Sequence, residues 1–448
     1  MGFPGEAMRE MSKDNLLRSW KEISAYLGCD TRTCHRWEKK HGMPVHRAEG
    51  GAEAKSHVFA YKDELDRWFK ETFKSSNGTR EKAKPGHRYL RWAEGAVAGL
   101  LLLTAAIFLI PWRVVLRQPA DFAVDWSTLI ILDKEKRELW RKDTKMEDLQ
   151  TEDFYRRNFQ VMHRDEGNIL PALVIRDING DGDNEVLFAP KRVNDQTGEG
   201  WLYCYDCKGS ELWRFHGGRE LRCGGKLFSP DFRIAGFHTH DLDGDGRLET
   251  VVESFQAPDW PCQLAVLDAS GKMVGEFWNA GYLRELAYHD IDGDGREELL
   301  VVGVNNEYRG GCLIVFDTRN IRGSSPQTGE FACDGLAAGS ELYYVTVPYL
   351  DVSEAMGNRV DGLRNIGITE NGWIRLTAST GLWYEFGFDL KCVQISWGHG
   401  YIVRHEAMVK AGRIGSVLDE AYRAKLLAGI RYWNGSGWTA EPAKNRRD

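Results

Sequence analysis

The stretch DLDGDGRLETVV, residues 241–252, holds the pattern that decides the fold of most of this 448-residue chain. Asp stands at positions 1, 3 and 5 of a short loop, and Gly stands at position 6. Oxygen atoms spaced in this way can wrap around a hard divalent cation such as Ca²⁺. Two further segments, DINGDGDNE at 177–185 and DIDGDGREE at 290–298, share the pattern. We therefore expect three acidic loops of one kind.

The residues around these loops favour β-strands. A helix–loop–helix calcium site needs a bidentate Glu at position 12, but Phe188, Val252 and Val301 stand there, and the acid falls at position 9 instead. Strand-like runs, such as LLVVGV after the third loop, flank the loops. About three Ca²⁺ ions are expected, held by the side chains at positions 1, 3, 5 and 9 and by the carbonyl at position 7. The predicted ligands are Asp177, Asn179, Asp181, Asp183 and Glu185 in the first loop, Asp241, Asp243, Asp245, Arg247 and Glu249 in the second, and Asp290, Asp292, Asp294, Arg296 and Glu298 in the third.

The loops belong to a longer repeat. An apolar strand ending in Asp follows each loop, at Asp206, Asp268 and Asp317. A copy of this second half, LIILDKEKRELW, precedes the first loop and matches LYCYDCKGSELW in its spacing from Asp to Trp. Repeats of this length with Gly-rich turns indicate the blades of a β-propeller.

These repeats resemble the FG-GAP/VCBS family of calcium-binding β-propellers, which includes integrin α heads, over about residues 125–320. The resemblance implies an all-β propeller, expected over 120–440, with calcium in the loops. After residue 320 the acidic motif is missing, although NGWIRLTASTGLWYEF and GIRYWNGSGWT still predict hairpins and SVLDEAYRAKLLAG predicts a helix capped by Ser416. The number of blades stays open between six and seven.

The N-terminal part has a different character. After a tail over residues 1–16, SWKEISAYLGCDTRTCHRWEKKHGMPVHR predicts two helices joined by a turn at Gly28. These residues resemble the MerR-like and excisionase-like winged helix-turn-helix family over 17–72, which implies binding to duplex DNA. A protein-binding or vestigial head is the alternative. The residues expected to contact DNA are Arg32, Thr33, Arg36 and Lys40 on the second helix and Arg47, Lys55 and His57 in the wing.

A polar basic linker, residues 73–93, leads to GAVAGLLLLTAAIFLIPW, which has no charge. About 20 apolar residues span a bilayer, so a single transmembrane helix is expected over 94–112. More Lys and Arg precede this segment than follow it, which predicts a single-pass protein of the inner (cytoplasmic) membrane with a cytoplasmic N-terminus and an extracytoplasmic C-terminal domain. The predicted fold class is thus multidomain, with a small α+β winged-helix head, one transmembrane helix and an all-β propeller.

The distribution of net charge along the chain suggests that its two parts bind different partners. Residues 1–93 carry a net charge of +6 and the remainder −13. The favoured hypothesis is a membrane-tethered, bacterial one-component transcription regulator that acts as a possible homodimer, with a propeller that senses or docks a protein or glycan ligand. The alternatives are a surface adhesion or carbohydrate-binding protein and, less favoured, a polysaccharide-active enzyme. No catalytic constellation is recognisable, so no enzyme activity is expected. Seven Cys follow residue 112, and this odd number leaves at least one of them free or paired with another chain. Cys204, Cys207 and Cys223 are close enough in sequence to include one disulfide, but the sequence leaves the pairing open.

Overall fold

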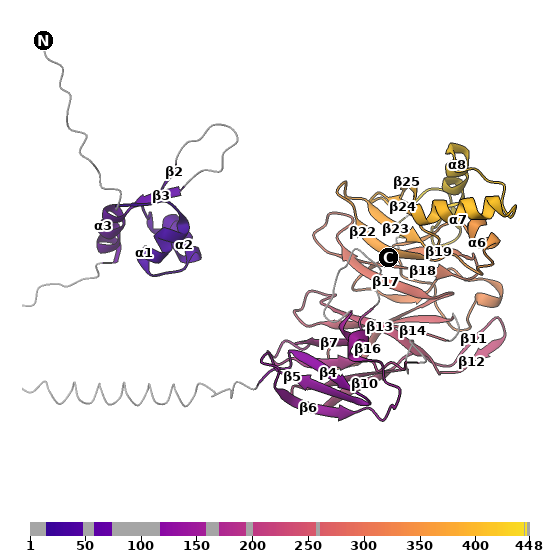
Figure 1. The fold of residues 1–448 in the computed structure, drawn as a ribbon, viewed down its shortest axis with the longest axis horizontal. Coiled ribbons are helices and arrows are strands. Elements are labelled where there is room, and N and C mark those ends of the chain that lie inside the picture. The colour runs from indigo at the N-terminus through magenta and orange to yellow at the C-terminus, as the bar shows by residue number, and fades with distance from the viewer. Residues whose placement is uncertain are drawn as a thin grey trace, which may run out of the picture. The chain divides into compact units, whose positions relative to one another are not determined.

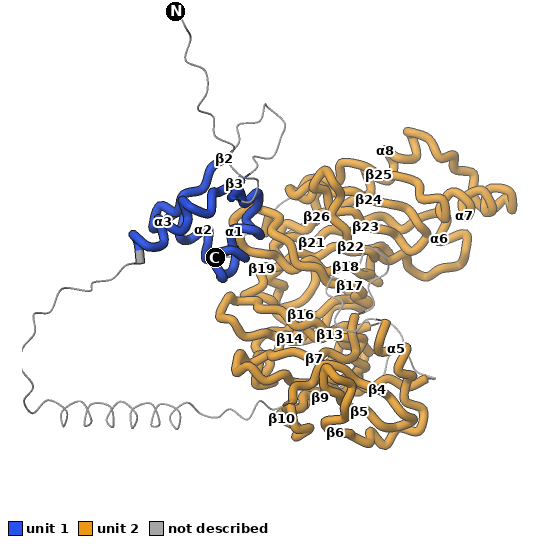
Figure 2. Tube along the Cα trace, turned by 60° about the vertical axis from the view of Figure 1, so that its left-hand side comes forward, with its two compact units in different colours: residues 1–112 blue, residues 113–448 orange. Residues whose placement is uncertain are grey.

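A computed structural model describes residues 15–47, 58–73, 117–157, 170–193, 200–256, 260–442 and 444–445. The chain divides into two compact units, residues 1–112 and 113–448 (Figure 2). Each unit is described by itself below.

Unit 1 is a small α+β unit. Ser19 and Asp30 cap the first two helices, accepting hydrogen bonds from the backbone N–H groups of Glu22 and Thr33. Gly28, with φ of 65°, ends the first helix. The core of the unit contains Ile23, Cys34, Met43, Ala60, Leu65 and Trp68. Its elements are β1 (Leu16–Leu17), α1 (Trp20–Leu27), α2 (Thr31–His41), β2 (His46–Arg47), β3 (Val58–Tyr61) and α3 (Lys62–Phe73), with the strands in the order β1-β3-β2.

The prediction of a winged helix-turn-helix head is wrong for what the structure describes. A wing requires a hairpin that extends beyond the helices, but β2 has only two residues, and residues 48–57, which would form the tip, lie outside the described residues. The described strands instead form a short sheet that shares one core with the helices.

The membrane prediction is also corrected. The expected span, residues 94–112, lies outside the described residues. Among the helices that the structure does describe, none combines the length and the apolar character needed to cross a bilayer. The single-pass topology and the inner-membrane localisation therefore have no support in the structure.

Unit 2 is built mostly from antiparallel sheets, and the strands that begin each sheet follow one another in chain order, whereas β20, β26 and β27 join earlier sheets (Figure 1). The first sheets are β4 (Asp121–Asp125), β5 (Thr128–Leu132) and β6 (Glu138–Asp143), then β7 (Leu173–Arg176), β8 (Glu185–Phe188), β9 (Trp201–Tyr205) and β10 (Glu211–His216), with the short helix α5 (Glu152–Arg156) between them. The hairpin β11 (Leu221–Cys223) and β12 (Lys226–Phe228) comes next.

The central sheets are larger. One contains β13 (Arg233–His240), β14 (Glu249–Phe255), β15 (Cys262–Leu267), β16 (Met273–Asn279) and β20 (Arg322–Ser324). The next contains β17 (Leu283–His289), β18 (Glu298–Asn305), β19 (Gly310–Asp317), β21 (Tyr343–Thr346), β26 (Arg431–Trp433) and β27 (Trp438–Thr439). The final sheet contains β22 (Leu363–Ile368), β23 (Ile374–Ala378), β24 (Leu382–Phe386) and β25 (Cys392–Trp397). Outside the sheets lie η2 (Gly329–Phe331), α6 (Asp351–Ala355), α7 (His399–Lys410) and α8 (Glu420–Gly429).

The described sheets do not close into the predicted propeller. The sheet β4–β6 lies at one end of unit 2 and the sheet β22–β25 lies at the other (Figures 1 and 2). A closed ring would pack the last sheet against the first. Instead, Tyr401 of α7 and Tyr422 and Leu426 of α8 join the apolar cluster of the sheet β22–β25. These helices occupy apolar surface that a further blade would need, so the prediction of a closed propeller is wrong.

The sequence repeat has a structural cause. Trp140 of β6 packs on Gly209, whose Cβ, if present, would lie 2.8 Å from the ring. Trp213 of β10 packs in the same way on Gly271 of the following sheet. Each Gly lies in a turn between the third and fourth strands of a sheet, with φ of 80° to 85°. The repeated Trp and Gly therefore join one sheet to the next.

The C-terminal hairpins form as predicted, as β23–β24 and β26–β27. The helix expected to begin at Ser416 begins at Glu420 instead, because the side chain of Asp419 accepts a hydrogen bond from the backbone N–H of Tyr422. Ser416 donates its hydroxyl hydrogen to Asp351 at 2.7 Å, which holds it outside the helix.

Candidate metal-binding loops

Each acidic loop joins the first two strands of a sheet, as the sequence predicts: β7 to β8, β13 to β14 and β17 to β18. In the second loop, the two carboxylate oxygens of Asp241 accept hydrogen bonds from the backbone N–H groups of Gly244 and Gly246, at 2.8 and 3.0 Å. Glu249 accepts from the N–H of Leu242 at 2.9 Å. The backbone thus fixes the carboxylates at positions 1 and 9.

The other two loops repeat this scheme. Asp177 and Asp290 accept from the N–H groups at positions 4 and 6, at distances between 2.7 and 2.9 Å. Glu185 and Glu298 accept from the N–H at position 2, both at 3.0 Å. Identical bonding in three sheets indicates that the loops are built for one purpose.

Two glycines make the tight winding possible. In the second loop, Gly244 and Gly246 have φ of 83° and 88°, a conformation that residues with a Cβ rarely adopt. The glycines at positions 4 and 6 of the other loops also have positive φ. Because the backbone turns back on itself here, a loop of this length can bring several acidic side chains close together.

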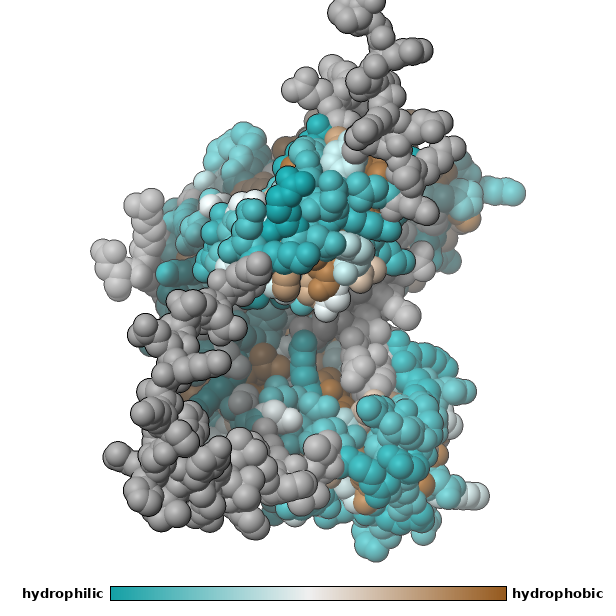
Figure 3. Space-filling view, turned by 90° about the vertical axis from the view of Figure 1, so that its left-hand side faces the viewer, coloured by the Kyte–Doolittle hydropathy of each residue, from teal (hydrophilic) through white to brown (hydrophobic). Residues whose placement is uncertain are grey.

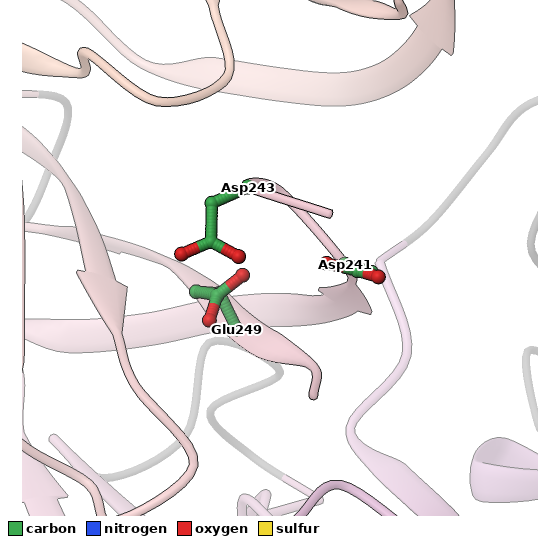
Figure 4. Close-up of side chains that lie close together, drawn as sticks. All are labelled: Asp241, Asp243 and Glu249. Atoms are coloured by element: carbon green, nitrogen blue, oxygen red, sulfur yellow. The ribbon is translucent and has the colours of Figure 1, made fainter. Parts of the chain in front are cut away.

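The second and third loops bring carboxylates close enough to share one ion. Ligand atoms of Asp241, Asp243 and Glu249 all lie within 4.8 Å of one another, and the carboxylates of Asp243 and Glu249 face each other (Figure 4). Ligand atoms of Asp290, Asp292 and Asp294 form an equivalent group. Glu298 lies outside that group, so the third loop presents its acids differently from the second. Several carboxylate oxygens at this spacing fit a hard cation such as Ca²⁺.

The first loop is tied to the segment that enters unit 2. Gln118 donates its amide to a carboxylate oxygen of Asp183 at 2.7 Å, and its own carbonyl accepts from the N–H of Asn184 at 2.8 Å. Asn179 supplies the side-chain oxygen at position 3, which accepts from the N–H of Asp181 at 2.8 Å. The side chain of Asp183, at position 7, therefore hydrogen-bonds to Gln118, and its backbone carbonyl remains the predicted metal ligand.

The side chain of a lysine, Lys444, contacts the third loop. The ammonium of Lys444 donates to Asp292 at 2.9 Å and lowers the pKa of that carboxyl. Sequence reasoning missed Lys444, because it lies 152 residues from its partner and no local pattern signals the contact. Gln118 was missed for the same reason.

Burial sets the proton affinity of the Glu at position 9. The pKa of Glu185 is raised to about 7, mainly by burial and also by the neighbouring aspartates, while the hydrogen bond from the N–H of Ile178 acts in the opposite direction. Burial also raises the pKa values of Glu249 and Glu298. A bound cation would offset both effects, because it stabilises the charged carboxylate.

A cavity of about 440 Å³ lies between the second and third loops. His240, Arg296, Glu297 and Arg319 line it together with Asp241 and Asp243. His240 stacks on Tyr288 at 3.8 Å and contacts Glu297 at 2.9 Å, and its burial lowers its pKa. His289, at the equivalent strand end, packs near the ring of Phe388 instead. The two histidines therefore share a register position but not a site.

The residues predicted to contact DNA are placed as follows. Arg32, Arg36 and Lys40 are exposed on α2, whereas Thr33 is half-buried and donates its hydroxyl hydrogen to Asp30 at 3.0 Å. Arg47 pairs with Glu38 at 2.6 Å. Lys55 and His57 lie outside the described residues. Nothing in these positions tests a contact with nucleic acid.

One disulfide, Cys223–Cys333, joins the hairpin β11–β12 to the segment after η2. Cys204 and Cys207, which the sequence allowed as partners of Cys223, are free and buried. The two cysteines lie 110 residues apart, so no local sequence pattern could have predicted this disulfide.

No model of a protein family matches the chain. The expected membership in the winged-helix and FG-GAP/VCBS families is therefore not confirmed, and both assignments are wrong, because the described residues show neither a winged helix-turn-helix head nor a closed propeller. A rhamnogalacturonan endolyase, YesW, of Bacillus subtilis (strain 168) is 27% identical over 118 residues, which make up 25% of this chain and 16% of the lyase. The chain thus spans about a sixth of that relative's length.

Several solved structures are distantly similar. BamB from Moraxella catarrhalis matches with 14% identity and a TM-score of 0.28, over 62% of this chain and 61% of BamB. The biofilm matrix protein Bap1 of V. cholerae matches with 14% identity and a TM-score of 0.22, over 63% of this chain and 47% of Bap1. A Bacteroides caccae protein of unknown function matches with 10% identity and a TM-score of 0.27, over 62% and 72%. Scores this low support no argument about function or fold.

Proposed function

We propose that unit 2 is a calcium-stabilised, non-catalytic module that binds a polar ligand, either a glycan or a protein. The observation that carries the calcium part is the shared bonding of the three acidic loops. Each loop holds its position-1 and position-9 carboxylates by backbone N–H groups, and in the second and third loops three carboxylates lie close enough to share one ion. The ion would join the first two strands of a sheet, where carboxylates would otherwise repel one another.

The character of the surface supports a polar ligand. The described residues drawn in Figure 3, which include residues of both units, are mostly hydrophilic. Large apolar side chains that are exposed, such as Trp126, Leu227 and Val274, are scattered over different elements. A module of this kind recognises its ligand through hydrogen bonds and single aromatic side chains more than through a broad apolar patch.

Thermal unfolding of the full-length chain tests the calcium part. Binding to the folded state alone stabilises it by about RT ln(1 + [L]/Kd) per site. We expect millimolar Ca²⁺ to raise the melting temperature relative to chelator, and Asp243→Ala to lose part of that increase. Asp268→Ala serves as the matched control, because Asp268 is also a turn Asp of the same sheet but lies outside the loop. Equal melting in Ca²⁺ and chelator would contradict the proposal.

A polysaccharide-active enzyme is the second candidate, favoured by the partial similarity to the rhamnogalacturonan endolyase. A lyase would release unsaturated products that absorb ultraviolet light. Incubating the full-length chain and Ca²⁺ with rhamnogalacturonan tests this directly. We expect no increase in absorbance, and a steady increase that scales with protein concentration would favour the enzyme.

A further inference from the structure

The sheet β22–β25 carries a groove of about 620 Å³ on its outer face. This volume falls in the range of small-molecule sites, about 300–1,000 Å³. Its lining comes from three strands and from the turn between β22 and β23. The residues that matter below are Asn365, Thr369, Asn371, Arg375, Thr377 and Trp383.

The strand register explains why this face is polar. Thr377, Trp383 and Ser396 lie opposite one another on neighbouring strands, so their side chains point to one face. The residues that alternate with them, Leu376 and Tyr384 among others, point to the other face and are fully buried. One face of the sheet therefore packs in the core while the other presents polar groups around a single Trp.

Trp383 is placed to serve as a platform. It is 37% exposed, although a Trp on a four-stranded sheet could have packed inward. Gly398 lies against it, and a Cβ there would come within 3.4 Å of the indole. The backbone at Gly398 and the guanidinium of Arg375, whose carbon lies 5.3 Å from the ring centre, hold the indole in place, and the exposed part of the ring faces the groove.

The backbone at Asn365 departs from a regular strand. The pairing of β22 with β23 shifts between Arg364 and Gly367, and Asn365 has φ of 57°. A bulge of this kind re-aims a side chain, and Asn tolerates the left-handed conformation better than most residues. The buried carboxylate of Glu285 accepts from the N–H of Ile366 at 3.2 Å and so supports the bulge from below. The strand is thus shaped to bring Asn365 into the groove lining.

The groove carries no excess of positive charge. Arg375 pairs with Glu385 through contacts of 2.6 and 2.7 Å, and Glu385 is only 4% exposed. The lining itself holds one further charge, the exposed carboxylate of Glu370. No described cation of the lining is left over to attract an anionic ligand, so the groove disfavours an anion, and its amide and hydroxyl groups suit a neutral ligand.

We propose that this groove binds a neutral saccharide, stacked on Trp383 and hydrogen-bonded by Asn365, Thr369, Asn371 and Thr377. The C–H face of a pyranose is apolar and carries slight positive charge, which suits the negative face of an indole. Amide and hydroxyl groups both donate and accept, as sugar hydroxyls require. The proposal rests on the proposed binding function and specifies its ligand as a neutral glycan.

Affinity electrophoresis of the full-length chain in Ca²⁺ tests it, in native gels that contain hydroxyethylcellulose, xyloglucan, galactomannan or polygalacturonate. We expect at least one of the three neutral polymers to retard the protein, and Trp383→Ala to weaken that binding by about ten-fold or more. Asn365→Gly keeps the backbone conformation while it removes the amide, so we expect a loss of about three-fold or more without loss of folding. Trp126→Ala is the control, because Trp126 is exposed on another sheet.

Retardation by none of the three neutral polymers would overturn the proposal, as would retardation by polygalacturonate alone. Neutral binding that survives both Trp383→Ala and Asn365→Gly would also overturn it. If Trp383→Ala fails to fold, the Asn365→Gly result decides. Melting experiments separate the two proposals. Stabilisation by Ca²⁺ without saccharide binding would support the calcium proposal and contradict the saccharide proposal. Saccharide binding without stabilisation by Ca²⁺ would do the reverse.

Discussion

At the scale of single residues, burial and backbone bonding control the acidic loops. Glu185 is 2% exposed, and burial raises its pKa to about 7 against an ordinary value of 4.5. The folded state without an ion therefore binds a proton that the unfolded state releases. The stabilising effect of this proton is fully present below pH 4.5 and is lost as the pH rises through about 7.

Glu185→Gln should remove this pH dependence. In chelator we expect the unfolding free energy of the parent chain to fall by about 3 kcal/mol between pH 4.5 and pH 8 through this group. Gln cannot titrate, so the variant should show a shallower fall, measured by urea unfolding at several pH values. Ca²⁺ should flatten the parent profile, because the ion stabilises the charged form. Parallel profiles for parent and variant in chelator would contradict the account.

At the scale of elements, the sequence was informative where a pattern is local. The three acidic loops, their flanking strands and the later hairpins follow from spacing within about twelve residues, as in β13–β14. The contacts of Lys444 and Gln118 with the loops depend on tertiary packing, and no sequence pattern marks them. The groove at Trp383 was missed because a single Trp within a predicted strand can be buried in the core or exposed on the surface, and the sequence does not distinguish the two.

Lys444→Ala should strengthen calcium binding at the third loop. The ammonium of Lys444 lies 2.9 Å from Asp292 and competes with an ion for that carboxylate. Both side chains are more than a third exposed, so solvent screens the effect, and we expect a gain in affinity of roughly two- to five-fold. Isothermal titration with Ca²⁺ measures it. Lys391→Ala breaks a comparable pair with Glu441 away from the loop and should leave the affinity unchanged.

At the scale of the whole molecule, the sheets of unit 2 form a row, whereas the repeats predicted a ring. The repeats specify how one sheet packs on the next, through contacts such as Trp140 on Gly209 and Trp213 on Gly271. They do not specify closure, which depends on what covers the last sheet. Here α7 and α8 cover it, and their sequence carries no blade pattern.

The disulfide also acts at this scale, because it links segments 110 residues apart. Replacing both Cys223 and Cys333 with Ser should lower the free energy of unfolding by about 2–4 kcal/mol, since the unfolded chain loses a constraint. Urea unfolding of the double variant measures this. Cys392→Ser, which changes a free and half-buried thiol, should have a much smaller effect. Equal stabilities of the double variant and the parent would show that the bond does not form.

The central claim is that the acidic loops bind calcium, and a count of bound ions tests it most directly. Equilibrium dialysis of the full-length chain against millimolar Ca²⁺, followed by metal analysis, should give about three ions per chain, one per loop. Asp243→Ala should lower the count by about one, and Asp268→Ala should leave it unchanged. A count near zero, or one that Asp243→Ala does not lower, would contradict the account.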